Sequence, residues 1–165
     1  MKPLTGLDIH HLREAEGWLM LSNSREANEA LDRLSPANGL HPDALHLRWH
    51  ICAHEKQWGV CAEVGRALCE AQPESVQGWI NYANALFYLK RFQEAIDVTL
   101  PILERFPSNP YIRYNMACYE CQKGHHDDAI KWFTKALDLG NRKEIQEMAL
   151  ADPDLEPLRA RIVQI

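Results

Sequence analysis

Apolar residues recur along most of this chain with helical spacing, and the pattern predicts a series of paired amphipathic helices. A helical stretch of about 14 residues leads through a short break to a second helical stretch and then a turn. This order occurs four times. The short breaks are SNS at 22–24, KQ at 56–57, KR at 90–91 and KGH at 123–125. Proline and glycine mark the turns between pairs, as expected where helices stop. The chain is therefore predicted to be all-α.

The four helix pairs are copies of one unit at a fixed spacing of 34 residues. Ala129 lies one step after Ala95, and two further steps back lead to Cys61 and Ala27. No gap is needed, which places the repeats at 8–41, 42–75, 76–109 and 110–143. A two-helix unit cannot bury its own apolar face, so each must stack on its neighbours. We therefore expect residues 1–165 to form one domain.

The third and fourth repeats carry a family resemblance. The third repeat contains Trp79, Tyr82, Ala83, Leu86, Phe92, Ala95 and a closing Pro107. The fourth contains Met116, Ala117, Gly124, Ala129, Phe133, Ala136 and Leu137. With the 34-residue period, these residues resemble the tetratricopeptide repeat (TPR) family. The other two repeats match less closely, with Ser24 where a ring is usual and Trp49 in place of a small residue. The resemblance implies a right-handed α-α superhelix of four helix-turn-helix repeats.

The repeat pattern ends near residue 143, and residues 144–165 are expected to cap the solenoid. Apolar spacing predicts two short helices, at 142–150 and 154–163. A cap would cover the apolar face of the last repeat. The alternative is that the apolar end RIVQI is a docking tail or the contact of a homodimer.

Three histidines spaced by four residues, His46, His50 and His54, share one face of the first helix in the second repeat. In TPR proteins the first helices line a concave groove, so the resemblance places these residues there. Equivalent positions in later repeats add amide and aromatic side chains. Rings bury area and amides bond to an extended backbone, as a peptide-binding groove requires. The predicted partner-binding residues are His46, His50, His54, Gln77, Asn81, Asn84, Phe87, Tyr88, Tyr111, Tyr114, Asn115 and Cys118.

Two known TPR binding modes can be compared with this groove. Some members bind the peptide backbone with a ladder of asparagines, and Asn81 and Asn115 supply two rungs. The alternative is that these asparagines only bond to neighbouring helices. Others grip a C-terminal carboxylate with lysine and arginine. Here the corresponding positions hold His46, Gln77, Tyr111 and Asn115, so a clamp of that kind is not expected.

Composition excludes several classes of function. The chain has 18 Lys and Arg against 23 Asp and Glu, for a net charge of -5, and no basic run, which argues against nucleic-acid binding. No segment approaches the roughly 20 apolar residues of a membrane span, and no signal peptide is evident. The five cysteines fall in helical pattern and suggest free thiols in a reducing compartment. We therefore expect a cytoplasmic protein.

Metal binding and catalysis have less support in the sequence. Three imidazoles at i, i+4 and i+8 extend over about 12 Å, too far for all three to reach one zinc ion. Cys118 and Cys121 form a single C-x2-C pair. No phosphate-binding loop or catalytic motif is present. We expect no metal, no cofactor and no enzymatic activity.

The expected function is that of an adaptor or scaffold that binds a protein or peptide in its groove. The alternative is a small chaperone similar in size and layout to the TPR chaperones of type III secretion, which would hold an apolar client segment. A metal-binding or enzymatic protein built on the His46, His50 and His54 face is the third possibility.

Overall fold

The computed structural model describes residues 4–165, which contain helices and no strand. Eight helices follow one another in pairs: α1 (Gly6–Met20), α2 (Ser24–Asp32), α3 (Pro42–His54), α4 (Trp58–Ala71), α5 (Val76–Tyr88), α6 (Phe92–Arg105), α7 (Pro110–Gln122) and α8 (His126–Leu139). They are followed by α9 (Arg142–Ala151), the 3-10 helix η1 (Pro153–Leu158) and α10 (Arg159–Ile162). The predicted all-α fold with four helix pairs is confirmed. None of the described helices has the length and apolar character needed to cross a membrane.

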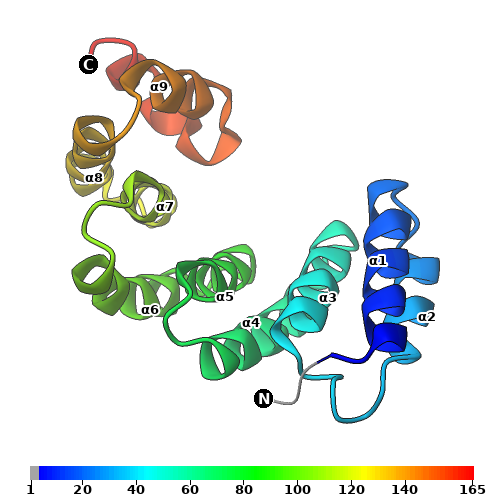
Figure 1. Ribbon diagram of the computed structural model, residues 1–165. Coiled ribbons are helices and arrows are strands. Elements are labelled where there is room, and N and C mark those ends of the chain that lie inside the picture. The colour runs from blue at the N-terminus through cyan, green and yellow to red at the C-terminus, as the bar shows by residue number, and fades with distance from the viewer. Residues whose placement is uncertain (1–3) are drawn as a thin grey trace. The chain divides into compact units, whose positions relative to one another are not determined.

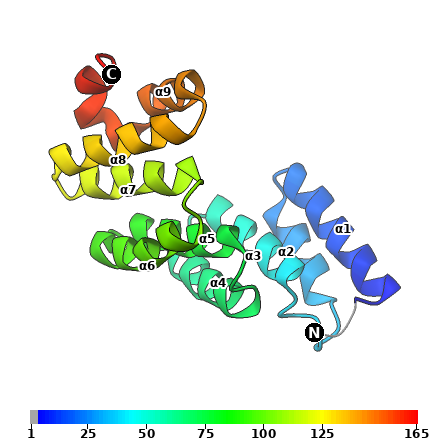
Figure 2. The same ribbon diagram turned by 60° about the vertical axis from the view of Figure 1, so that its left-hand side comes forward.

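The helices form two compact units, with the boundary inside α5 between Ala85 and Leu86. In the N-terminal unit α1 packs on α2, α3 packs on α4, and α3 also contacts both helices of the first pair. Figure 1 shows α1 and α2 side by side. In the C-terminal unit α7 packs on α8 and α6, and α9 packs on α8; the neighbouring α7 and α8 are clear in Figure 2.

Small buried residues set the helix spacing in both units. The four positions that define the register, Ala27, Cys61, Ala95 and Ala129, are all completely buried. In the N-terminal unit α4 approaches α5 so closely that a Cβ on Gly65 would lie 2.8 Å from the Cα of Tyr82. Only glycine fits such an approach between two backbones. The repeated pattern of small residues therefore reflects close helix packing.

The turn within each helix pair has one backbone geometry. Ser22, Lys56, Lys90 and Gly124 all have positive φ, between 56° and 85°, and lie one repeat apart. Each belongs to a Schellman motif; in the second turn the Gln57 N–H donates to the Cys52 carbonyl over 2.8 Å. Only the fourth turn has glycine, so each of the other three residues bears a cost of roughly 1–2 kcal/mol for its left-handed conformation.

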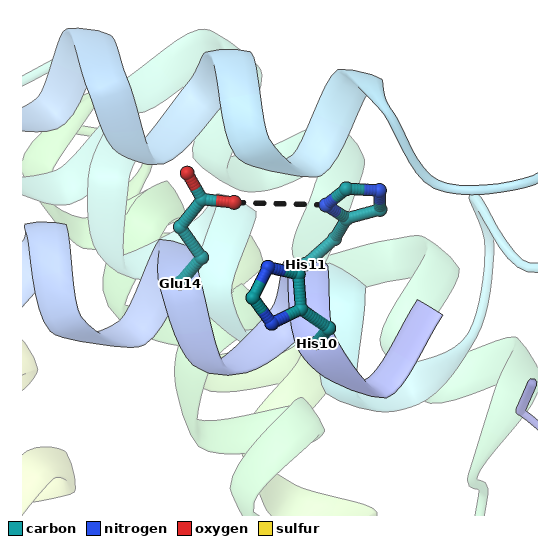
Figure 3. Close-up of side chains that lie close together, drawn as sticks. All are labelled: His10, His11 and Glu14. Carbon is teal, nitrogen blue, oxygen red and sulfur yellow. Dashed lines mark ion pairs between the residues drawn. The ribbon is translucent and has the colours of Figure 1, made fainter. Parts of the chain in front are cut away.

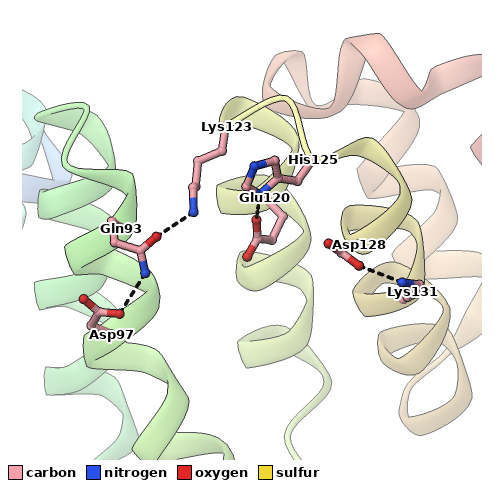
Figure 4. Close-up of polar contacts among 7 residues, drawn as sticks. All are labelled: Gln93, Asp97, Glu120, Lys123, His125, Asp128 and Lys131. Atoms are coloured by element: carbon pink, nitrogen blue, oxygen red, sulfur yellow. Dashed lines mark hydrogen bonds and ion pairs between the residues drawn. The ribbon is translucent and has the colours of Figure 1, made fainter.

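Polar contacts on the surface of the C-terminal unit join its helices (Figure 4). Lys123 at the end of α7 donates to the Gln93 side chain on α6 over 2.6 Å. Within the α7–α8 pair, the His125 ring lies 2.8 Å from the Glu120 carboxylate. Both contacts lie at the surface, so they contribute little stability.

The C-terminal segment differs from the prediction in one element. α9 confirms the first predicted helix, but the second begins as the 3-10 helix η1, which contains Pro153 and Pro157. Proline lacks the backbone N–H and clashes with the preceding turn, which disfavours a regular α-helix there. Leu155 and Leu158 are buried, and η1 contacts both α9 and α7. The segment therefore covers part of a repeat helix.

All five cysteines are free and buried, in agreement with the predicted free thiols. Burial raises the pKa of Cys61 and of Cys69 to about 12. Such thiols stay protonated at neutral pH and act as small apolar side chains.

Candidate functional site

A pocket of about 540 Å³ lies on the first helices of the first two repeats, α1 and α3. We call it the N-terminal pocket. Its lining is Leu4, Ile9, Leu12, Arg13, Glu16, Asp43, His46, Leu47 and His50. Leu12 is buried and Leu47 half-buried, whereas Arg13, Asp43 and His50 are exposed. An apolar floor with a few polar groups at the rim is the usual composition of a binding pocket.

The two walls of the pocket are equivalent positions of two successive repeats. On α3, Asp43, His46, Leu47 and His50 lie at i, i+3, i+4 and i+7, which is one helical face. The α1 wall has the same spacing, because Ile9, Leu12, Arg13 and Glu16 precede those four residues by one repeat each. The 34-residue period therefore builds the pocket.

Asp8 ties the start of α1 to the loop before α3. This side chain is 2% exposed, and it accepts hydrogen bonds from the Ser35 N–H and the Asn38 amide, each over 2.8 Å. Thr5 completes a capping box with it. The Ser35 backbone, then Thr5 and Asn38, hold the pKa of Asp8 well below its usual range. Asp8 was not among the predicted site residues, although the T-x-x-D spacing at 5–8 is a helix-start signal.

The rim of the pocket is polar and slightly acidic at neutral pH. Partial desolvation of the ring, and then the charge of His46, lower the pKa of His50. His50 is therefore neutral at pH 7, and its ring can accept as well as donate. Two carboxylates, Glu16 and Asp43, outnumber the one guanidinium, Arg13. This balance favours an occupant with basic groups.

The other predicted residues of the N-terminal unit lie outside the pocket. His54 is exposed, and its Nδ1 lies 3.1 Å from the hydroxyl of the buried Ser24 on α2. On α5, the exposed Gln77 donates to Asn81 over 2.8 Å. Asn81 is buried, and its Nδ2 has no hydrogen-bond partner among the described residues. Asn84 is half-buried. Two of the three histidines are thus brought together at one site.

In the C-terminal unit, the chain's own C-terminal segment bonds to the predicted binding face of α7. The Tyr114 hydroxyl donates to Asp152 over 2.7 Å, and the Cys118 thiol donates to the same carboxylate oxygen over 3.8 Å. One turn further, Gln122 donates to the Asp154 carbonyl over 2.8 Å. Tyr114 and Cys118 are buried, and burial raises the pKa of both groups.

The remaining predicted residues divide between core and surface. Phe87 is buried, with ring centroids 5.4 Å from Phe92 and 5.2 Å from Tyr119. Tyr88 and Tyr111 are each 45% exposed. Tyr111 lies in the first turn of α7, and Asn115 is half-buried. Phe87 is therefore part of the packing of its unit.

Comparison with known proteins finds similar structures at low sequence identity. A MamA structure from Desulfovibrio magneticus RS-1 is 14% identical, with a TM-score of 0.75 over 98% of this chain and 94% of that chain. A crystal structure of MamA protein is 16% identical, with a TM-score of 0.74 over 96% of this chain and 87% of that chain. No family model matches the chain, and no curated protein matches it significantly. The similarity shows the fold, an all-helical TPR-like repeat.

Proposed function

We propose that this chain is a protein-binding adaptor or scaffold that holds a segment of a partner protein in the N-terminal pocket. The observation that carries the proposal is the pocket itself, of about 540 Å³, built from equivalent faces of α1 and α3. The buried Leu12 and the half-buried Leu4 and Leu47 would take an apolar side chain of the partner. The proposal assigns binding to the pocket and no chemical step.

The polar rim would orient that segment. His46 and His50 supply imidazole groups, and Glu16 and Asp43 supply carboxylates for a basic residue beside the apolar anchor. Rim charges of this kind act on association rate and specificity more than on affinity. The proposed partner segment is therefore an apolar anchor flanked by lysine or arginine.

The proposed site is narrower than the predicted groove. It keeps His46 and His50 and adds Leu12, Arg13 and Leu47 from the pocket. Partner binding by α7 would first require Asp152 to leave Tyr114 and Cys118. A role for Tyr88 and Tyr111, which are exposed, stays a prediction.

The test is affinity selection of peptides from a random library with the full chain, followed by calorimetric titration of the selected peptide. Leu47→Asp places a charge on the apolar floor and should weaken binding at least tenfold. The matched control is Leu100→Asp, because Leu100 is an exposed leucine of the C-terminal unit. Circular dichroism checks that both variants fold. Equal loss in both variants, or no loss in Leu47→Asp, would contradict the proposal.

The same titrations address the chaperone alternative. A chaperone would select apolar peptides without a shared sequence, whereas an adaptor should select one defined motif. The degree of consensus among the selected peptide sequences therefore separates the two functions.

A further inference from the structure

Three side chains of the metal-ligand type lie together near the start of α1. His10, His11 and Glu14 each offer one ligand atom, and these three atoms lie within 4.8 Å of one another. Figure 3 shows the His11 ring directed at the Glu14 carboxylate, with the His10 ring beside them. The cluster is separate from the N-terminal pocket, which uses other residues of the same helix.

Two of these atoms are buried and lack a hydrogen bond. Both His11 Nδ1 and Glu14 Oε2 have no hydrogen-bond partner in the described structure, and they face each other over 3.6 Å. His11 is 9% exposed. Two ligands of a tetrahedral zinc ion, each about 2.0–2.1 Å from the metal, lie about 3.4 Å apart. The spacing of the two atoms is therefore close to that of a zinc-bound pair.

The carboxylate is held in place from its other side. Glu14 Oε1 accepts from the Arg33 guanidinium over 2.8 Å, and Arg33 also donates to the Glu29 carbonyl over 3.2 Å. Outer contacts of this kind orient metal-binding carboxylates. The Arg33 charge repels a cation, but the same hydrogen bond fixes the orientation of the carboxylate.

We propose that His10, His11 and Glu14 bind one divalent transition-metal ion of the Zn²⁺ class. Two imidazoles and a carboxylate are a common donor set for zinc, with water in the fourth position. His10 is exposed, and its ring would move toward the other two ligands to complete the set. Because the ion binds the folded unit, it stabilises that unit by mass action. This site does not involve the histidines of α3.

The test is calorimetric titration of the full chain with zinc chloride at pH 7.5. We expect one ion per chain, and His11→Gln and Glu14→Gln should each weaken binding at least tenfold. The matched control is His125→Gln, which removes an exposed histidine that also faces a glutamate, Glu120 (Figure 4). It should bind zinc like the wild type.

A second variant keeps the proposal testable where the buried substitutions disturb folding. His10→Gln changes an exposed side chain, so it should fold normally and bind zinc several-fold more weakly. Binding of cobalt(II) should give the absorption of a tetrahedral site in the wild type and lose it in His10→Gln. The proposal is overturned by an absence of zinc binding, by unchanged affinity in His10→Gln and His11→Gln, or by a loss in His50→Gln instead. The last result would place the ion on α3, whereas a simple His11–Glu14 ion pair predicts no zinc binding.

Discussion

Equivalent faces of the first helices differ between the two units in whether another segment of the chain covers them. In the N-terminal unit, His46 and His50 line a pocket on α3. Two repeats later, the same positions on α7 hold Tyr114 and Cys118, which are buried and bonded to Asp152. The repeat decides which face a side chain occupies. A segment outside the repeats decides whether that face is available.

The side chains themselves account for part of this difference. A hydroxyl or thiol can be buried at little cost once it has an acceptor, and Asp152 provides one. Charged groups such as Arg13, Glu16 and Asp43 lose much more when they leave water. The α7 face is therefore suited to being covered permanently by the C-terminal segment. The N-terminal pocket is suited to binding and releasing a partner.

The largest expected effect comes from removing an anchor of the C-terminal cover. Leu158→Ala should destabilise the C-terminal unit by about 2–5 kcal/mol, because Leu158 is 1% exposed and its loss leaves a cavity. Urea unfolding followed by circular dichroism measures the change. Hydrogen exchange should speed up in α7, while α1 and α3 keep their rates. A loss below about 0.5 kcal/mol, typical of a surface substitution, would show that η1 does not hold this cover in place.

A smaller loss is expected when the shared acceptor is removed. Asp152→Ala should cost about 1–3 kcal/mol, because the buried Tyr114 hydroxyl loses its partner and the Asp154 N–H at the start of η1 loses its capping acceptor. The matched control is Asp154→Ala, since Asp154 bonds to Gln122 through its backbone carbonyl. Equal urea midpoints for the two variants would mean that the carboxylate of Asp152 contributes nothing particular.

Acid should change the stability of the two units to different extents. The pKa of Asp8 is lowered by folding, so its stabilising contribution is present above the ordinary pKa of 3.8 and is lost as pH falls further. The pKa of Asp154 is raised, mainly by burial and then by Asp152, so its ionisation costs stability as pH rises. Between pH 5 and pH 2, roughly the window of these shifts, the N-terminal unit should lose more stability.

Tryptophan fluorescence measures the loss of stability in the N-terminal unit. Four of the five tryptophans, Trp18, Trp49, Trp58 and Trp79, belong to the N-terminal unit, whereas Trp132 lies on α8. Asp8→Asn should lower the urea midpoint at pH 7 and flatten its dependence on acid. If the urea midpoint of this variant fell with pH as steeply as that of the wild type, groups other than Asp8 would cause the acid sensitivity.

The smallest effect concerns the turns that both units share. Lys56→Gly should stabilise the N-terminal unit by up to about 1 kcal/mol, because glycine adopts positive φ without strain. Lys90→Gly should likewise stabilise the C-terminal unit, whereas Gly124→Ala should destabilise it. Thermal unfolding of the three variants measures the set. A destabilised Lys56→Gly would show that the lysine side chain outweighs the backbone strain.

The sequence predicted the fold well because its 34-residue period repeats both the buried small residues and the turns. Ala27, Cys61, Ala95 and Ala129 are all buried, as that register requires. The type of turn was less visible, since lysine and serine occupy left-handed positions where glycine would have signalled them. The 3-10 start of the second C-terminal helix follows from Pro153 and Pro157, which apolar spacing ignores.

The candidate site could be predicted only in part. Helical spacing placed His46 and His50 on one face, and the structure brings them into one pocket. Spacing could not show that Asp152, 38 residues after Tyr114 in the chain, would bond to it. Contacts between a repeat and a non-repeating segment leave no periodic trace in the sequence. The same holds for Asp8, whose partners include Ser35 and Asn38.

The most direct test of the account is the dissociation constant of one library-selected peptide for three forms of the full chain. We expect at least tenfold weaker binding to Leu47→Asp, and wild-type binding to Asp152→Ala, because the peptide occupies the N-terminal pocket. Wild-type affinity in Leu47→Asp, together with changed affinity in Asp152→Ala, would place the binding site on α7 and contradict the central claim.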